Sequence, residues 1–208
     1  GRVRTDNVDG FLLDRGFQVL QTAYPEAQRI LDYAALELKP FYPGALVRFE
    51  GRFHRIADLF RRPQDSIKTI ISPIGTFVDK LRIARFRKKV RRGSLRDLFR
   101  RPETSSIERL RVEGFSDTIV NRFFRPFFGG VFLEDKLETS SRMLEFVFRM
   151  FAEGDTALPA GGMGSIADQL ASALPSGAVR LGARVESLQE GKVILDSGEE
   201  LRGKVIVV

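Results

Sequence analysis

Apolar residues are spaced differently in three parts of the chain, and this spacing predicts which parts are helical. Between residues 65 and 153 apolar positions recur every three or four residues, which is the period of helices that bury one face. Before residue 65 and after residue 178, apolar and polar residues alternate over short runs, as in strands separated by turns. The pattern predicts an α+β fold with a helical domain, a small mixed or antiparallel sheet, and a β-meander at the C-terminal end.

The N-terminal residues predict short strands. Apolar runs at 11–13 and 17–20 predict two strands around a turn at Asp14-Arg15-Gly16, and Asp9-Gly10 is a further turn signal. This part of the chain is therefore expected to be extended and rich in turns.

A short helix and a hairpin are predicted next. Pro25 suits the first position of a helix over residues 26–33, because proline lacks the N–H that would be unpaired there. Alternating apolar residues predict a β-hairpin over 45–56 that turns at Glu50-Gly51. His54, the only histidine, lies in this hairpin, and we interpret it as a half-exposed structural residue.

Capping signals and apolar spacing predict five helices in the central part of the chain. Ser105 and Glu108 form a capping box that starts one of them, and Pro102 ends the helix before it. The last of the five is so rich in apolar residues that we expect it to be buried nearly all round. The predicted helices cover residues 76–90, 94–101, 105–114, 116–124 and 139–152.

A glycine turn follows the helical part. Gly161, Gly162 and Gly164 predict a tight turn, and the Ser-x-x-Asp pair at 165–168 predicts the start of a helix. This arrangement directs helical N–H groups forward, where an anionic or strongly polar cofactor edge is favoured. Residues 162–167 also match the pattern G-x-G-x-x-A, which we reject as a dinucleotide motif because no buried strand precedes it. Taken alone, the turn is interpreted as a helix start without a ligand.

Beyond the turn the apolar period becomes two. Alternating residues over 179–185 and 193–195 predict a β-meander with turns at Gly191 and Gly198. The continuous apolar run 205–208 predicts a strand that is buried on both faces. Such a strand needs a sheet to join, so its open edge is expected to favour a homo-oligomer.

Composition excludes several kinds of chemistry. The chain has no cysteine and one histidine, which excludes disulfides, thiol nucleophiles and multi-histidine or cysteine metal sites, so no metal site is predicted. No apolar run approaches the roughly 20 residues of a membrane span, and the first residues show no signal-peptide pattern. We therefore expect a cytoplasmic or peripheral membrane protein.

Charge is concentrated in one segment. The net charge is +7, and residues 80–111 hold thirteen basic residues against three acidic ones. A membrane-surface or lipid-binding module without chemistry would contact an anionic leaflet through Arg82, Arg85, Phe86 and Lys89, whereas a solvated basic face on a core helix is the simpler alternative. We expect no nucleic-acid partner, because no recognition motif accompanies the arginines.

Phenylalanine is concentrated in the helical part. Nine of the eighteen phenylalanines fall between residues 115 and 151. For any single one, packing in a helical core is the first interpretation. The alternative is that part of the cluster lines an elongated apolar substrate cavity, with Gly129-Gly130 allowing backbone to pass close to the ligand.

Four motifs, in matching order and spacing, cover nearly the whole chain. Each motif resembles a feature of one superfamily. Its Gly-Gly-Arg-x-x-Ser/Thr motif resembles Gly1-Arg2-x-x-Thr5, and its flavin-proximal segment resembles Asp9-Gly10-Phe11-x-x-Asp14-x-Gly16. Its returning helix start resembles Leu158-Pro-x-Gly-Gly-Met163, and its cofactor-domain meander resembles the segment 184–208. This is the superfamily of flavin-containing amine oxidases, phytoene desaturases and protoporphyrinogen oxidases.

The resemblance implies the central fragment of an FAD-dependent oxidoreductase. Residues 1–24 and 158–208 would be parts of its FAD domain, and residues 25–157 its largely helical substrate-binding domain. The family's N-terminal G-x-G-x-x-G motif and C-terminal flavin segment are not in this sequence, so FAD is expected in the full-length protein and the fragment alone is expected to be inactive. Because the flavin itself accepts the hydride, no catalytic residue is assigned.

The resemblance also implies positions for cofactor and substrate. A small apolar compound, polycyclic or isoprenoid, is the expected substrate. The residues implied at the flavin are Gly1, Arg2, Asp14, Gly16, Gly161, Gly162, Met163 and Val185, and those expected at the substrate are Phe17, Gln18, Phe127, Phe128 and Phe148.

Overall fold

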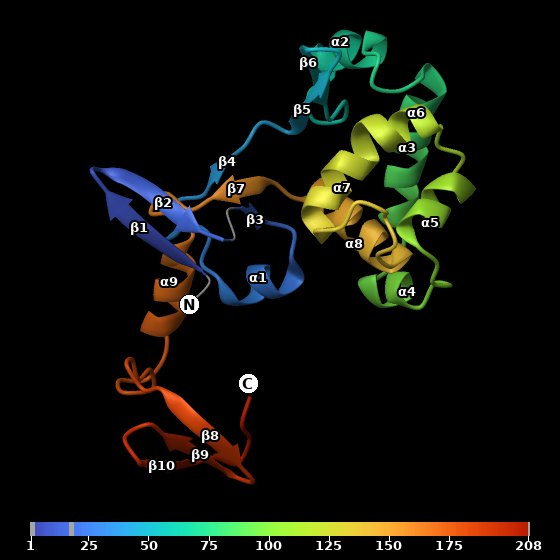
Figure 1. Cartoon of the computed structure of the whole chain (residues 1–208). Coiled ribbons are helices and arrows are strands. Elements are labelled where there is room, and N and C mark those ends of the chain that lie inside the picture. Colours follow the sequence, from blue (N-terminus) through green and yellow to red (C-terminus); the bar gives the residue numbers. More distant parts are fainter. Residues whose placement is uncertain (1–2, 17–18, 208) are drawn as a thin grey trace. The chain divides into compact units, whose positions relative to one another are not determined.

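The structure is a computed structural model that describes residues 3–16 and 19–207. The chain forms two compact units, residues 1–166 and residues 167–208 (Figure 1). The first unit combines helices with small antiparallel sheets, and the second holds a three-stranded sheet. The fold is therefore α+β, as predicted.

The first unit begins with a hairpin. Strands β1 (Arg4–Val8) and β2 (Phe11–Arg15) pair antiparallel, with Thr5 opposite Asp14. The turn at Asp9-Gly10 has φ values of 52° and 85°, as two-residue hairpin turns require. The prediction of a turn at residues 14–16 was wrong, because the Asp-Gly pair supplies the turn earlier and leaves Asp14 inside β2.

A three-stranded sheet joins the two ends of the helical part. Its order is β3 (Leu20–Gln21), β7 (Thr156–Leu158) and β4 (Lys39–Pro40), and both pairings are antiparallel. Beside it, the N–H of Thr22 donates to the carbonyl of Asp155, and the N–H of Asp155 donates to Oγ1 of Thr22, both at 2.8 Å. The chain therefore enters and leaves the helical part through adjacent strands.

The second predicted hairpin is confirmed. Strands β5 (Gly44–Phe49) and β6 (Arg52–Ala57) pair around Glu50-Gly51, where both residues have positive φ. His54 lies half-buried opposite Val47 in the register. Local turn chemistry was sufficient to predict this element.

The helices of the first unit start close to the predicted positions. Thr76, Ser94 and Ser105 each accept a hydrogen bond from the backbone three residues further on, which completes a capping box in each case. The helix predicted over 26–33 ends earlier, because Leu31 has extended backbone. The helices are α1 (Pro25–Ile30), α2 (Ser66–Ile71), α3 (Phe77–Val90), α4 (Leu95–Phe99), α5 (Ser106–Val112), α6 (Asp117–Ile119), α7 (Arg125–Phe132) and α8 (Ser141–Glu153), with a 3₁₀ turn η1 (Pro63–Asp65) before α2.

The helix predicted to end at residue 124 continues further. A π-helical segment, η2 (Val120–Phe124), connects α6 directly to α7, and Pro126 lies in the first turn of α7. Proline is tolerated there because a helix start does not use its N–H. The proline therefore does not stop the helix, and the phenylalanine-rich segment becomes part of it.

The hydrophobic core of the first unit lies among α3, α5, η2, α7 and α8. Phe86, Phe124 and Phe128 are fully buried in it, and burial of one such side chain contributes about 1.5–3 kcal/mol. Helix α8 is buried or half-buried at every position except Met143 and Glu153. The prediction that this helix is buried nearly all round is therefore confirmed.

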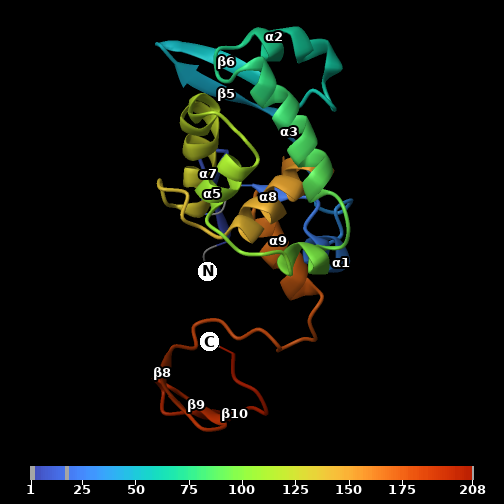
Figure 2. The same cartoon turned by 90° about the vertical axis from the view of Figure 1, so that its right-hand side faces the viewer.

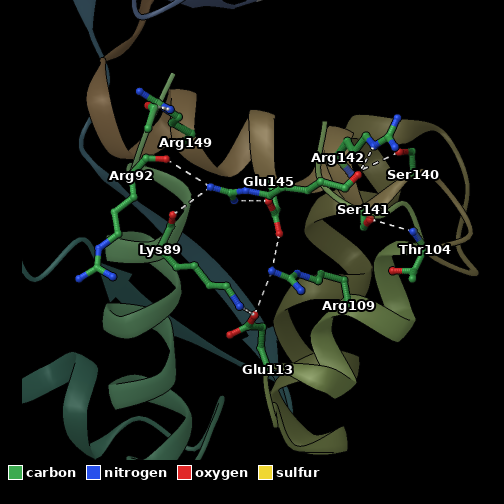
Figure 3. Close-up of polar contacts among 12 residues, drawn as sticks. Lys89, Arg92, Thr104, Arg109, Glu113, Ser140, Ser141, Arg142, Glu145 and Arg149 are labelled. Atoms are coloured by element: carbon green, nitrogen blue, oxygen red, sulfur yellow. Dashed lines mark hydrogen bonds and ion pairs between the residues drawn. The ribbon is translucent and has the colours of Figure 1, made fainter. Parts of the chain in front are cut away.

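Ion pairs connect the same helices. Glu145 on α8 is buried and pairs with Arg101 and Arg109, and Glu113 pairs with Arg109 and Lys89 (Figure 3). Carboxylates from other parts of the unit thus neutralise part of the basic excess of residues 80–111.

Asp79, in the first turn of α3, is a second buried carboxylate. It accepts hydrogen bonds from the backbone N–H of Thr76 and of Ser116, both at 2.9 Å, and from both hydroxyls. Burial is the largest single influence and raises the pKa of Asp79, but the hydrogen bonds from Ser116 and Thr76 together outweigh it, so that the pKa falls below its usual 3.8. Asp79 thereby joins the start of α3 to the start of α6.

We expect Asp79 to make the fold sensitive to acid. A carboxyl with a lowered folded-state pKa contributes stability that is fully present above its unfolded pKa of about 3.9 and is lost as the pH falls through the folded value. Thermal unfolding measured between about pH 6 and about pH 2.5 should therefore show a smaller loss of stability for Asp79→Asn than for the unchanged protein. The exposed Asp135→Asn is the control, and an equal acid dependence in all three proteins would contradict the assignment.

The second unit is a β-meander. Strands β8 (Val185–Gln189), β9 (Lys192–Leu195) and β10 (Glu200–Arg202) form an antiparallel sheet in the order β10-β9-β8, with positive φ at Gly191 and Gly198 in the turns. The strand predicted over residues 179–185 is absent before Val185. Residues 205–207 form no strand either and include exposed valines, because no described strand pairs with them. The predicted doubly buried strand is therefore corrected.

Candidate functional site

The β1–β2 hairpin meets the glycine turn that precedes helix α9 (Gly164–Ser172). Thr5 Oγ1 donates to Asp14 Oδ1, and that same oxygen accepts the backbone N–H of Met163 at 2.9 Å. The N–H of Gly164 donates to Thr5 Oγ1 at 2.7 Å. These four contacting groups, together with Gly162, form what we call the hairpin–glycine junction.

Two glycines of the junction are required by packing. A Cβ atom on Gly162 would lie 2.5 Å from Cγ2 and Oγ1 of Thr5 and 3.0 Å from Oδ1 of Asp14, and the φ of Gly162 is +83°. A Cβ atom on Gly164 would lie 3.0 Å from the backbone nitrogen of Thr5. At Gly161 the only close neighbour would be the side chain of Ser165, which can rotate away. The turn is therefore shaped to receive the hairpin.

The N–H groups at the start of α9 are engaged within the protein. Taken alone, the glycine turn was interpreted as a helix start without a ligand, with a polar or anionic cofactor edge as the alternative, and these groups donate to Asp14 and Thr5. A carboxylate at a helix N-terminus satisfies unpaired donors and interacts favourably with the helix dipole. The carboxylate at this helix start is therefore the protein's own Asp14.

The other residues predicted at the flavin are distributed as follows. Gly16, directly after β2, is exposed with φ +77°, and Gly161 is also exposed. Met163 is buried, and Val185 begins β8 in the second unit. Gly1 and Arg2 lie outside the described residues. The structure thus brings Asp14, Gly162 and Met163 together, and it adds Thr5, whose role the Ser/Thr position of the motif could have indicated.

The phenylalanines predicted at the substrate belong to the helical core. Phe128 is buried against Phe124, and Phe148 lies edge-to-face with Phe86 at 5.0 Å between ring centroids. Phe127 is partly buried, and its ring contacts Phe128 of the same helix, Phe123 of η2 and Phe151 of α8. Core packing, the first interpretation, therefore accounts for these contacts, and buried Phe128 lines no open cavity. The other two predicted residues, Phe17 and Gln18, lie outside the described residues.

Two hollows on the first unit are lined by residues other than these phenylalanines. One, of about 500 Å³, is lined by residues of α7 and the loop after it, including Arg125 and Glu134. A Cβ atom on Gly129, which also lines it, would lie 3.1 Å from the carbonyl oxygen of Glu134, so this glycine serves the contact between helix and loop. The other hollow, of about 540 Å³, runs beside α3 and is lined by Phe60 and basic residues.

The residues predicted at a membrane are mostly engaged within the protein. Phe86 is fully buried in the core, which contradicts its assignment to a membrane face. Lys89 pairs with Glu113 at 2.5 Å, and Arg82 lies 3.7 Å from Asp79. Arg85 alone of the four predicted residues is exposed. The face of α3 that carries Phe86 therefore points into the fold.

Within residues 3–16 and 19–207 no group of three or more histidine, cysteine, aspartate or glutamate side chains is placed to hold a metal ion. In the same part of the chain, no helix has both the length and the apolar character needed to cross a bilayer.

Comparison with known proteins identifies the family. A comparison with curated proteins found no match. A family model described as flavin-containing amine oxidoreductase matches residues 1–208, the entire sequence. This chain is therefore a member of the flavin-containing amine oxidoreductase family.

Proposed function

We propose that the full-length protein oxidises a small apolar substrate, polycyclic or isoprenoid, by hydride transfer to FAD. The family match supports flavin-dependent oxidoreductase chemistry and implies FAD as the cofactor of the full-length protein. When bound, FAD supplies the acceptor for a hydride, so the protein's tasks are to position the substrate and to exclude water.

The observation that carries the proposal is the hairpin–glycine junction. It joins Thr5 and Asp14 near the start of the chain to Met163 and Gly164, which follow the whole helical part. The resemblance implies that both of these segments would lie beside the flavin. The hydrogen bonds of the junction hold the two segments at a fixed distance from each other. Hydride transfer needs a precise distance between substrate and flavin, and such rigid support favours it.

The chemistry of the junction fits a supporting role toward the flavin. Its two backbone donors are engaged by Asp14 and Thr5, so it would not bind the cofactor's phosphates. Gly16 and Gly161 are exposed, and a backbone without a Cβ atom allows a flat ring system to approach closely. We assign to these two glycines the contact with the flavin. The role of the junction is to hold the two glycines in place.

An apolar substrate is favoured by the character of the helical part. Phe127 and Phe148 are partly buried and pack against the core, so part of each side chain remains accessible. A hydride donor that is itself apolar needs no ionic anchor. These two residues would contact the substrate, and Phe128 would support them from behind through its ring contact with Phe127 at 5.1 Å.

The test uses the full-length protein purified from cells. We expect it to be yellow, with flavin absorbance that bleaches when an apolar polycyclic or isoprenoid compound is added without oxygen, and to be recoloured by an electron acceptor. Protein that retains no flavin when supplied with FAD during expression would refute the flavin assignment. Bleaching by polar amines, with no response to apolar compounds, would refute the substrate class alone.

A further inference from the structure

The exposed face of helix α3 changes character along its length. Phe77 and Leu81, one turn apart, are 60% and 56% exposed at the N-terminal end. Arg85 and Lys88 continue the same face further along the helix and are also exposed. At 1.5 Å per residue, the basic residues follow Leu81 by about 6–10 Å along the axis. The face is thus apolar at one end and basic beyond it.

Helix α2 extends the apolar end. Ile67 and Ile71, one turn apart on α2, are 71% and 75% exposed. Lys80 Nζ donates to the carbonyl oxygens of Ile70 and Ser72, at 2.5 and 2.9 Å, and so fastens the end of α2 to the first turn of α3. Figure 2 shows α2 beside the start of α3 at one end of the helical part. We call the exposed Ile67, Ile71, Phe77 and Leu81 the apolar tip.

Basic groups lie behind this tip. The hollow of about 540 Å³ beside α3 is lined by Phe60 and by Arg85, Lys88 and Arg92, among others. Two further arginines of the hollow are already engaged: Arg87 with Asp58 at 2.5 Å and Arg91 with Glu153 at 3.5 Å. The exposed Arg85, Lys88 and Arg92, which we call the basic collar, therefore present positive charge to the solvent.

We propose that the apolar tip and the basic collar dock the protein on the surface of an anionic lipid bilayer. The polar interface on each side of a bilayer is about 5–8 Å thick, because the whole bilayer is about 40–45 Å and its hydrocarbon core about 30 Å. When the tip reaches the edge of the hydrocarbon, the collar lies at the level of the lipid phosphates, where cations are attracted. The spacing along α3 matches this layering.

Charge favours a bilayer over a second copy of the chain. Two copies docked through this face would bring Arg85 and Lys88 close to the same residues of the other copy, and like charges repel. Anionic headgroups instead complement the collar. The proposal replaces the predicted membrane face around Phe86 by a neighbouring one, and it does not depend on the flavin chemistry.

Vesicle binding tests the proposal directly. The protein is sedimented with phosphatidylcholine vesicles and with vesicles that also contain phosphatidylglycerol. We expect at least about ten-fold stronger partitioning to the anionic vesicles, weakened by salt, because basic residues near such a surface are attracted to the anionic headgroups. The double variants Phe77→Ser with Leu81→Ser, and Arg85→Glu with Lys88→Glu, should each reduce this partitioning about ten-fold or more.

Matched controls are available on the same unit. Val112→Ser removes an exposed apolar residue from α5, and Lys136→Glu reverses an exposed charge in the loop after α7, so both should bind vesicles like the unchanged protein. Circular dichroism and thermal unfolding check that all variants fold. Equal binding to neutral and anionic vesicles would overturn the proposal. It would also be overturned if the control substitutions reduced vesicle binding as strongly as the substitutions in the tip. Self-association that disappears in the tip variants, without vesicle binding, would overturn it in favour of a second copy.

Discussion

Replacing Gly162 with alanine is expected to destabilise the first unit by about 3 kcal/mol. The φ of +83° costs a residue with a Cβ atom about 1–2 kcal/mol. The new Cβ would also lie 2.5 Å from the side chain of Thr5 and 3.0 Å from Asp14, and such overpacking costs about 1–3 kcal/mol. For a chain of this size, the two effects together lower the melting temperature by about 6–12 °C.

The matched control for this change is Gly10→Ala. Gly10 has nearly the same φ, +85°, but a Cβ atom there would have no neighbour within 4 Å. Its cost is therefore the backbone strain alone, about 1–2 kcal/mol. Thermal unfolding of both variants separates strain from packing. In the full-length protein, Gly162→Ala should also reduce the fraction of protein that retains flavin, whereas Gly10→Ala should not. Equal melting temperatures for the two variants would show that the hairpin does not press on the glycine turn.

The second large effect is expected from Glu145→Ala, which we estimate at about 3–5 kcal/mol. Glu145 is buried on α8 and pairs with Arg101 and with Arg109, the latter at 2.7 Å (Figure 3). Removing its carboxylate leaves the partly buried guanidinium of Arg101 without this partner, whereas Arg109 keeps its pair with Glu113, and an uncompensated charge in such a place is costly. Urea denaturation of the unchanged and variant proteins gives the difference in the free energy of unfolding.

An exposed ion pair of the same unit provides the control for Glu145. Glu26 pairs with Arg29 on α1, and both side chains are mostly exposed. Surface pairs of this kind contribute about 0–1 kcal/mol, so Glu26→Ala should change little. Replacing Glu145, Arg101 and Arg109 together by leucine should recover much of the loss, since no unpaired charge is then left. A loss below about 1 kcal/mol for Glu145→Ala would mean that solvent reaches the pair.

Elements defined by neighbouring residues could be predicted from the sequence. The capping boxes at Thr76, Ser94 and Ser105 and the hairpin turn at Glu50-Gly51 depend on contacts across a few residues. The physical determinants of these elements are therefore present in short segments. The same holds for the glycine turn at 161–164, which precedes α9 as expected.

Predictions failed where a local signal competed with distant contacts. A helix was predicted to end at residue 124, but Pro126 lies in the first turn of α7, where core packing of Phe124 and Phe128 continues the helix. Phe86 was predicted to contact a membrane, but its ring packs against Phe115 and Phe148 from other segments. Spacing along one helix does not reveal which face the rest of the fold covers.

The sequence alone determined the fold class, the positions of most helix starts and the resemblance to a flavoenzyme family, because these depend on residue type, local spacing and motif order. Only the tertiary structure decided which group meets the glycine turn. Asp14 and Met163 are 149 positions apart, and no periodic pattern connects them. Their hydrogen bond forms because the chain returns beside its own beginning, where the unpaired N–H groups of a helix start and a carboxylate satisfy each other.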